Sequence, residues 1–304
     1  MKVAVTGSTG FVGKHLCAML QERNHEVVAL TRDVTKAPRG TEARAWDGRD
    51  AEALKTATAG CDAIVNLAGE NIFAKKWDAE FKKTIRASRI DCTKACVEAC
   101  KAGPKILVNA SATGYYGPRG PEPCDEDSMA DMWNFLSSVC LEWEAEAKKA
   151  EAAGVRVVLL RIGVVLGRDG GAIQKMLPPF RAGFGGPIGK GDQYLSWIHI
   201  DDVCGLFVRA VEDAGWKGTY NATAPHPVTN KEFSKTLARL LRRPSFFVTP
   251  PFMMKLMLGD VAELLTTGQN VVPKRALAGG YEFRYPTLEG ALRNVLDLPV
   301  ARSA

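Results

Sequence analysis

The chain has 304 residues, 46% of them hydrophobic, which is enough to bury a full core as one large domain or one domain with an appendage. Its formal net charge of +6 comes from scattered basic residues, a pattern that suits an anionic small ligand and argues against nucleic-acid binding. No apolar run approaches the ~20 residues of a membrane span, and no signal peptide precedes the first apolar run. We expect a soluble protein of the cytoplasm, or of an organelle matrix or stroma if a targeting peptide has been removed.

The first half of the chain alternates strand-like and helix-like segments. Apolar strand-like runs lie at residues 3–5, 26–32, 62–69, 105–112 and 156–167, with a short additional run at 42–46. Helical patterns lie between them, at residues 14–23, 51–57, about 75–102 and 131–153. Short continuous apolar strands separated by helices indicate parallel strands that are buried on both faces. The predicted fold is therefore α/β, a Rossmann-type doubly wound parallel sheet.

Beyond residue 167 glycine and proline become frequent, above all at 178–193, as in loops that frame a substrate pocket. Asn230 is the expected N-cap of a helix with Glu232 in its first turn. The apolar stretch 250–265 is expected to pack as a core helix, with a membrane-surface helix as the alternative. We predict a smaller, mostly helical C-terminal substrate region.

The predicted domain division follows from this change in composition. A dinucleotide-binding core spans residues 1–167, and residues 195–225 return to it. Residues 168–194 and 226–304 form the substrate-side and C-terminal region.

Eight cysteines are present without a C-x-x-C pair. Cys92, Cys96 and Cys100 recur at helical spacing, which favours a small apolar stripe in a reducing compartment. A metal site is the alternative, but the clustered histidines that zinc prefers are missing from the sequence. We expect no metal.

A glycine pattern follows the first strand. Gly7 would let the chain turn sharply, Gly10 would let backbone approach a pyrophosphate, and Gly13 would let the next helix pack closely. The N-terminal amides and dipole of that helix then face the phosphates. The pattern predicts a dinucleotide site rather than a plain tight turn.

The end of the second strand bears on which dinucleotide binds. An Asp or Glu there would read the 2′-hydroxyl of NAD, whereas this chain has Thr31 and Arg32, and a guanidinium pairs well with a 2′-phosphate. Asp33 follows directly and weakens the distinction, and Arg32 as a solvated surface charge is the alternative. We predict NADP, with NAD as the second choice.

Several motifs carry a family resemblance, namely TGSTGFVG (6–13), LAG (67–69), SATGYYG (111–117) and WIHIDDV (197–203). They resemble landmarks of the extended short-chain dehydrogenase/reductases, the superfamily of sugar-nucleotide epimerases. Longer stretches resemble an atypical branch, epimerase-family proteins of the YfcH type: NLAGENI (66–72), KTIRASRI (83–90), residues 170–202 and NATAPHPVTNKEF (221–233). The stretch from PSFFVTPP to GYEFRYPTLEGAL is similar to the domain of unknown function that ends those proteins. The resemblance covers nearly the whole chain and implies no settled reaction.

The glycine motif and this resemblance together give a predicted cofactor site. Its residues are Gly7, Thr9, Gly10, Phe11, Val12, Gly13, Arg32, Leu67, Ala68, Gly69, Glu70, Gly163 and Val164.

The resemblance also implies a catalytic Tyr-x-x-x-Lys pair, which this chain lacks. Phe135 stands where the tyrosine belongs and Val139 where the lysine belongs. The usual Ser/Thr position falls on Ala112, and the structural asparagine of the preceding helix corresponds to Arg89. All four expected positions therefore depart from the pattern.

Other side chains could replace this machinery at the end of the fifth strand. Tyr115 or Tyr116 is a candidate acid, with Ser111 orienting a carbonyl and Arg86 or Arg89 supplying positive charge. The alternative is that one tyrosine packs under the nicotinamide and the other in the core. Glu70 is a possible base or a loop carboxylate, Lys175 is a pocket or surface lysine, and His199 beside Asp201 is a catalytic or bracing residue.

Two functions remain open at this point. The first is an NADP(H)-binding atypical reductase or epimerase acting on an unidentified small carbonyl or hydroxyl substrate. The second is a dinucleotide-binding sensor, or a subunit with a protein partner, that turns nothing over. The glycine-rich pocket loop favours the first and the missing Tyr/Lys pair favours the second.

Overall fold

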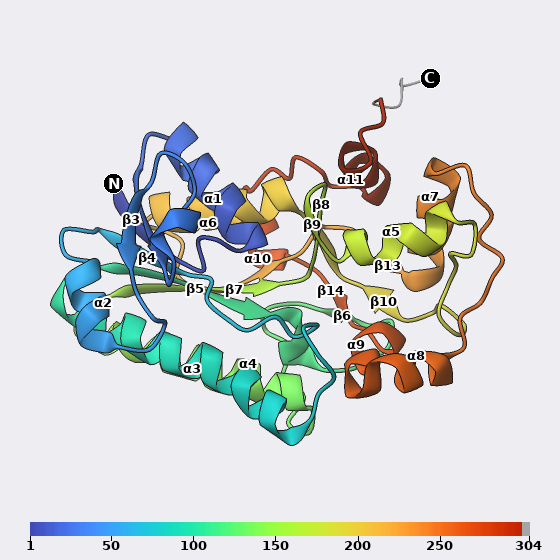
Figure 1. Cartoon of the computed structure of the whole chain (residues 1–304), viewed down its shortest axis with the longest axis horizontal. Helices are drawn as coiled ribbons and strands as arrows, with labels where there is room; N and C mark the ends of the chain where they lie inside the picture. Colours follow the sequence, from blue (N-terminus) through green and yellow to red (C-terminus); the bar gives the residue numbers. More distant parts are fainter. Residues whose placement is uncertain (300–304) are drawn as a thin grey trace.

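A seven-stranded parallel sheet forms the centre of the computed structural model, which describes residues 1–299 (Figure 1). The strand order is β12-β7-β5-β4-β1-β2-β3. Because β1 lies between β4 and β2, the sheet grows outward from it in both directions, and this switch point is where such sheets bind ligands. The strands are β1 (Lys2–Thr6), β2 (Glu26–Thr31), β3 (Glu42–Ala45), β4 (Ala63–Asn66), β5 (Ile106–Ala112), β7 (Arg156–Ile162) and β12 (Gly218–Ala222).

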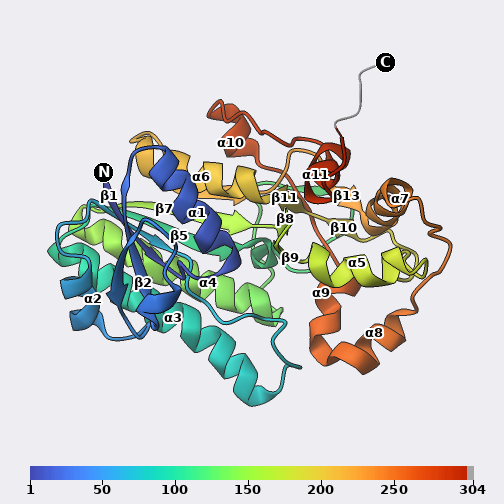
Figure 2. The ribbon, with the colours of Figure 1, turned by 45° about the horizontal axis from the view of Figure 1, so that its top comes forward.

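Helices cover both faces of this sheet, as the sequence predicts (Figures 1 and 2). On one face lie α2 (Ala51–Ala57), α3 (Ala79–Ala102) and α4 (Phe135–Lys148), and on the other α1 (Phe11–Glu22) and α6 (Ile200–Glu212). Each face has its own apolar core, and the central strands are buried on both sides. Cys92, Cys96 and Cys100 all lie in the α2–α3 core, where they pack as small apolar side chains.

The predicted strand 156–167 is wrong in one respect, because it divides at Gly163. Residues before the break form β7 of the main sheet, and β8 (Val164–Gly167) pairs instead with β11 (Trp197–His199) and β9 (Gly170–Gly171). A Cβ at Gly163 would lie 2.4 Å from the carbonyl oxygen of Ser196. Only glycine therefore allows the two segments to approach there.

Most of the remaining elements lie on the C-terminal side of the molecule, while the helix α10 (Lys274–Ala278) packs against β12 of the main sheet. The strands there are β6 (Pro123–Cys124), β10 (Tyr194–Leu195), β13 (Val228–Thr229) and β14 (Asn270–Val271). The other helices are α5 (Ile173–Arg181), α7 (Asn230–Leu240), α8 (Pro251–Leu258), α9 (Glu263–Thr266) and α11 (Leu288–Val295). Residues 1–299 also contain four 3-10 turns, η1 (Val34–Lys36), η2 (Thr113–Tyr116), η3 (Lys149–Ala153) and η4 (Gly259–Ala262). Residues 300–304 of the predicted C-terminal region lie outside the described residues.

Three local expectations for this side are wrong. The predicted loop 178–193 begins inside α5, which contains both Pro178 and Pro179. Thr229 rather than Asn230 caps α7, since its hydroxyl accepts a hydrogen bond from the Glu232 amide at 3.2 Å. The third is wrong only in part: no residue of α8 is buried, but Leu258 at its end and Val261 after it pack into a small core with Phe81 of α3.

No helix among residues 1–299 is both long and apolar enough to cross a membrane. In the same residues, no group of three or more His, Cys, Asp or Glu side chains is placed to hold a metal ion.

Candidate functional site

The glycine loop after β1 has the close packing that a phosphate-binding turn needs. Gly7 adopts a φ of +63°, and a Cβ there would lie 2.9 Å from the backbone of Leu67. A Cβ at Gly13 would lie only 2.2 Å from the Gly7 carbonyl oxygen, so this glycine lets α1 start against the loop. The loop therefore brings the chain after β1, the chain after β4 and the start of α1 together.

The N-terminus of α1 remains open to a ligand. Gly10 is its N-cap and supplies no side-chain hydrogen bond, and no acidic residue lies in the first turn. Such a helix end offers amide groups and a positive dipole to an anion. A dinucleotide pyrophosphate fits this end of the helix.

Phe11 fixes that loop to the β8–β9 hairpin. A Cβ at Gly170 would lie 2.4 Å from its ring, and Gly167 and Gly171 also lie against it. Next to it, His15 pairs with Asp169 at 2.9 Å. Thr9 is half-buried in the loop, and Val12 lies one residue inside the helix, where its carbonyl faces the Cys204 thiol.

At the end of β2, Arg32 is exposed while Asp33 is engaged within its own turn. The Asp33 carboxylate accepts hydrogen bonds from the Thr35 amide and hydroxyl and pairs with Lys36 at 3.0 Å. These bonds hold the pKa of Asp33 below its ordinary value. The Asp33 carboxylate is thus held by residues of its own turn. It does not pair with Arg32, whose side chain is exposed.

The amides of the loop after β4 are held by side-chain oxygens, most of them from neighbouring elements. The amides of Leu67 and Ala68 donate to the Thr6 hydroxyl, and the Glu70 amide donates to Ser88. The Glu70 carboxylate accepts from the Asn71 amide. The Glu70 carboxylate thus fixes its own loop, and its role as a base stays a prediction.

The predicted positions Gly163 and Val164 also have their backbone amides paired. The Gly163 amide donates to the Ala222 carbonyl and the Val164 amide to the Ser196 carbonyl. Both residues therefore join the main sheet to the β8–β11 sheet. Their amides are not available to a cofactor, so any contact there would come from their other atoms.

Helix α4 offers no proton-transfer pair, whatever register is chosen. No tyrosine or lysine occurs between residues 132 and 147. Phe135 packs edge-on against Trp77 with ring centroids 5.5 Å apart, and Val139 is buried. Leu136 and Cys140 of the same helix face Gly114. The helix is apolar where the related enzymes are expected to carry their acid.

A buried ion pair lies beside this apolar surface instead. Arg161 of β7 is 3% exposed, and its guanidinium donates to both carboxylate oxygens of Glu144 on α4, each at 2.8 Å. The Ser111 hydroxyl donates to the same carboxylate at 2.7 Å. Ser111 is itself buried, so its hydroxyl serves the ion pair rather than a substrate carbonyl.

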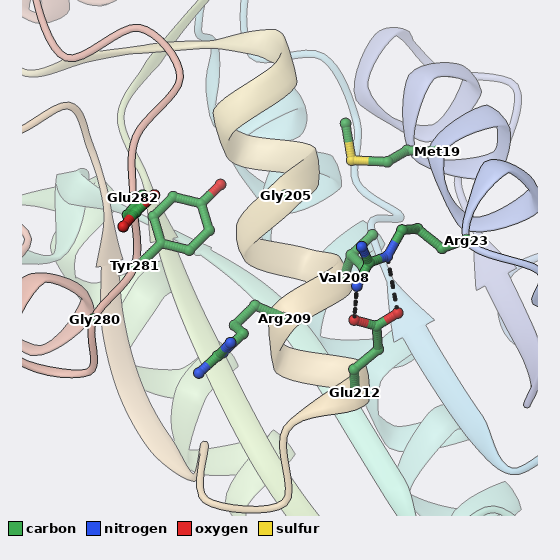
Figure 3. A pocket seen from close by; sticks show the side chains of 9 residues that line it. All are labelled: Met19, Arg23, Gly205, Val208, Arg209, Glu212, Gly280, Tyr281 and Glu282. Atoms are coloured by element: carbon green, nitrogen blue, oxygen red, sulfur yellow. Dashed lines mark hydrogen bonds and ion pairs between the residues drawn. The ribbon is translucent and has the colours of Figure 1, made fainter.

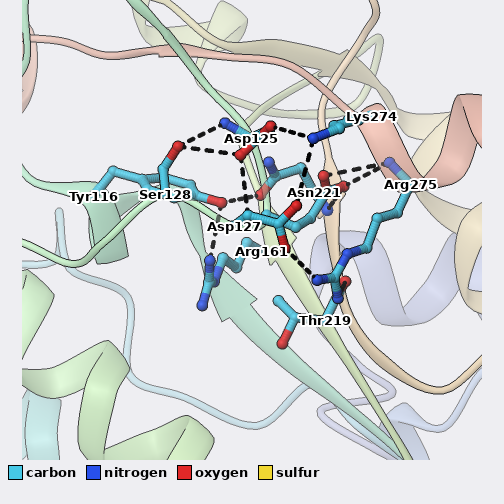
Figure 4. Close-up of polar contacts among 10 residues, drawn as sticks. Tyr116, Asp125, Asp127, Ser128, Arg161, Thr219, Asn221, Lys274 and Arg275 are labelled. Carbon is cyan, nitrogen blue, oxygen red and sulfur yellow. Dashed lines mark hydrogen bonds and ion pairs between the residues drawn. The ribbon is translucent and has the colours of Figure 1, made fainter.

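Tyr116 extends this network into the core (Figure 4). Its hydroxyl accepts from Arg161 at 2.9 Å and donates to Asn221 at 2.7 Å, and no part of the residue is exposed. Burial raises the pKa of Tyr116 to about 12. The sequence-based assignment of Tyr116 as an acid conflicts with this placement, because the phenol cannot reach a bound molecule.

Tyr115 has a different environment. Its ring is half-buried and stacks on the guanidinium of Arg161, whose central carbon is 3.3 Å from the ring centroid. Cation–π contact of this kind orients an aromatic ring. Of the three predicted catalytic residues, Tyr115 is the one that is not enclosed in the core.

The other sequence candidates divide between structural and open positions. His199 is 1% exposed, caps α6 through the Asp201 amide and pairs with Asn294, and burial lowers its pKa. It therefore braces the sheet. Lys175 on α5 is exposed and lies over the ring of Phe73, 5.2 Å from its centroid, which joins α5 to the loop after β4.

A groove of about 350 Å³ lies elsewhere, between α1, α6 and residues 280–282 (Figure 3). Its two arginines are already paired, Arg23 with Glu212 at 2.8 Å and Arg209 with Asp213 at 2.8 Å. The groove therefore offers few unpaired charges to a ligand. It also lies away from the carboxyl ends of the strands, where the glycine loop is.

Comparison with known proteins identifies the family. Residues 3–222 match the model of the NAD dependent epimerase/dehydratase family, and residues 249–295 match the domain of unknown function DUF1731. The chain belongs to the NAD dependent epimerase/dehydratase family. It has both an epimerase core and a C-terminal DUF1731 domain. This combination is the one that the resemblance to an atypical branch of the family predicts.

Relatives match over nearly the full length. The chain is 41% identical over 305 residues to the Arabidopsis thaliana protein named "Epimerase family protein SDR39U1 homolog, chloroplastic", covering 98% of this chain and 87% of that one. It is 38% identical to Epimerase family protein YfhF of Bacillus subtilis, covering 97% of this chain and 98% of that one. The crystal structure of human epimerase family protein SDR39U1 with NADPH superposes with a TM-score of 0.87 at 37% identity, over 98% of this chain and 99% of that one.

A UDP-glucose 4-epimerase from Thermotoga maritima, with a TM-score of 0.81 at 17% identity, shares the fold.

Proposed function

We propose that the chain is an NADP(H)-dependent atypical reductase or epimerase that acts on a small carbonyl or hydroxyl substrate. The glycine loop carries this proposal, because Gly7 and Gly13 let the chain after β1, the chain after β4 and the start of α1 pack more closely than any Cβ would allow, and α1 presents an uncapped N-terminus. The relative solved with NADPH supports the choice of cofactor. When bound, a nicotinamide supplies the hydride chemistry.

We assign Arg32 to the 2′-phosphate of this cofactor. Its guanidinium follows β2, where the adenosine end of a dinucleotide lies, and it is exposed. The neighbouring Asp33 carboxylate is bonded to Thr35 and Lys36, so its charge is partly neutralised. This arrangement favours a phosphate over a ribose hydroxyl.

Tyr115 is the candidate proton donor. It follows β5 at the carboxyl edge of the sheet, and its ring position is held by the stacked Arg161 guanidinium. A phenol in this place would give a proton to a developing alkoxide, or remove one from a hydroxyl. The apolar residues Leu136 and Cys140 across from Gly114 would exclude water on that side.

A second candidate function is a dinucleotide-binding sensor, or a subunit of a complex, without turnover. The observation that favours it is the apolar first half of α4, which has neither tyrosine nor lysine.

Deuterium transfer separates the two functions. Purified protein is incubated with NADPH deuterated at the nicotinamide C4 position and a small-molecule cell extract, and new labelled metabolites are sought by mass spectrometry. A labelled product that disappears in the Tyr115→Phe variant but persists in Tyr116→Phe would support the reductase. A labelled product that persists in Tyr115→Phe would remove the assigned acid.

An unlabelled extract, with NADPH binding confirmed in parallel, would favour the sensor. An epimerase returns its hydride to the same molecule and also leaves no net label. A search for newly formed stereoisomers of the extract metabolites, in a parallel mixture with NADP+, therefore accompanies the experiment as a test of epimerisation.

A further inference from the structure

An apolar cluster follows the carboxyl end of β4, where α3, α4 and α9 come together (Figure 1). Its centre is buried and includes Trp77 and Phe81. Six further side chains pack around this centre and keep part of their surface open, namely Ile72, Phe73, Phe135, Leu136, Leu258 and Leu264. The cluster therefore presents an apolar surface that the rest of the protein covers only in part.

Leu136 connects this cluster to the proposed proton donor. A Cβ at Gly114 would lie 3.4 Å from the Leu136 Cβ and 4.0 Å from the Cys140 sulfur. Gly114 directly precedes Tyr115 in η2, so the apolar side of α4 lies against the turn that carries the phenol. Because β4 and β5 are neighbours in the sheet, the chain with Phe73 and the turn with Tyr115 leave the same edge side by side. Ligands of such sheets bind at this edge, so a molecule at the phenol would lie next to the cluster.

Polar side chains beside this surface are already bonded within the protein. The hydroxyl of Ser137 and the amide group of Gln269 both donate to carbonyls of η2. Asn134 accepts from amides at the start of α4 and donates to Glu263 at 2.8 Å. The hydroxyl of Ser111 serves the buried ion pair. A sugar hydroxyl left unpaired against an apolar wall would weaken binding about tenfold or more.

The cations that border the surface offer hydrogen-bond donors alone. Three lysines lie over aromatic rings of the cluster, Lys75 over Phe81, Lys82 over Phe135 and Lys175 over Phe73. On α3, Arg86 pairs with Glu142, and Arg89 donates to two backbone carbonyls. A sugar hydroxyl both donates and accepts, whereas lysine and arginine cannot accept. These surroundings fit an apolar body better than a polyhydroxylated one.

We propose that the substrate is an apolar ketone or the corresponding secondary alcohol. Its alkyl or aryl body packs on the apolar cluster, and its oxygen faces the Tyr115 phenol. The inference rests on the proposed function and narrows its substrate class, with sugar nucleotides excluded. In the reduction, for which bound NADPH supplies the hydride and becomes NADP+, Tyr115 gives its proton to the carbonyl oxygen and regains one from water. The product is the secondary alcohol.

The test measures binding and turnover with the same ligands. The ligands are 2-butanone, 2-pentanone, 2-heptanone and 2-nonanone, which differ only in the length of the alkyl chain, and UDP-glucose as a sugar nucleotide. Dissociation constants for the NADP+-loaded protein are measured by saturation-transfer difference NMR, and oxidation of NADPH is followed by its absorbance. Leu136→Asn and Phe73→Asn each place an amide in the cluster. Leu141→Asn is the matched control, because Leu141 is a half-buried leucine of α4 outside the cluster.

We expect the affinity of the wild type to rise about two- to fourfold for each added methylene, as for burial of a CH2 group. Leu136→Asn and Phe73→Asn should each weaken 2-nonanone binding about tenfold or more without a change in the circular-dichroism spectrum, and Leu141→Asn should change it less than about twofold. Ketone affinities that do not depend on chain length would overturn the inference. Equal affinities in the wild type and both cluster variants, or tighter binding of UDP-glucose than of 2-nonanone, would also overturn it.

Failure of the proposed function gives a different result. Binding that depends on chain length, without oxidation of NADPH, would support the apolar site and count against a reductase. A labelled sugar nucleotide in the deuterium experiment, without ketone binding, would support the reductase and overturn the substrate class.

Discussion

Replacing Glu144 by glutamine should destabilise the fold more than any other single charge removal on α4. The glutamine keeps the size of the side chain but turns one acceptor oxygen into an NH2 group that faces the Arg161 guanidinium nitrogen 2.8 Å away. The Arg161 charge then remains in a site that is 3% exposed, without its counterion. Breaking a buried ion pair in this way costs about 3 to 5 kcal/mol. That is a large part of the free energy of unfolding of a typical protein, about 5 to 15 kcal/mol.

Urea unfolding followed by circular dichroism measures this effect. With a urea dependence of about 3 kcal/mol per molar, the midpoint should fall by roughly 1 to 1.7 M. Glu142→Gln is the matched control, because Glu142 lies two residues earlier on α4 and also pairs with an arginine, but at the surface. Its midpoint should not change measurably.

A double substitution tests the cause. Glu144→Met with Arg161→Met buries no charge, so it should be more stable than Glu144→Gln alone. Equal midpoint shifts for Glu144→Gln and Glu142→Gln would refute the reasoning, since burial would then not decide the strength of the pair.

Three further outcomes are expected. Gly13→Ala should weaken NADPH binding about tenfold or more, because its Cβ would lie 2.2 Å from the Gly7 carbonyl, while Gly103→Ala, whose nearest contact is 4.0 Å, should bind normally in a fluorescence titration. Arg32→Glu should lower the ratio of NADPH to NADH affinity, and an unchanged ratio in the same titration would end the assignment of Arg32. Tyr116→Phe should remove a phenol that titrates at about 12 in the absorbance at 295 nm. Because this folded-state pKa lies above the ordinary 10, the stabilisation by the Tyr116 phenol is complete below pH 10 and is lost towards pH 12. Tyr116→Phe should lack that loss of stability. Superimposable alkaline titration curves of the wild type and Tyr116→Phe would contradict this.

The sequence could not decide which of the three predicted catalytic residues is accessible to a substrate. Ser111 lies near the end of β5, and Tyr115 and Tyr116 follow that strand within five residues of it, so position along the chain could not rank them. The structure separates them by burial, because Ser111 and Tyr116 bond to the Glu144–Arg161 network and Tyr115 does not. A charged residue within the apolar run RVVLLRI was the one available signal of that network.

Patterns local in the sequence sufficed for the parallel sheet, the glycine loop and the absence of a Tyr/Lys pair on α4. The reason is physical: strand burial, tight turns and the chemistry of a missing side chain depend on neighbouring residues. The tertiary structure alone decided that Arg161 meets Glu144, that Tyr116 is enclosed beside them, and that the Arg89 guanidinium packs against Gly69. Those facts depend on which distant side chains meet and on how deeply they are buried, and no local pattern contains either quantity.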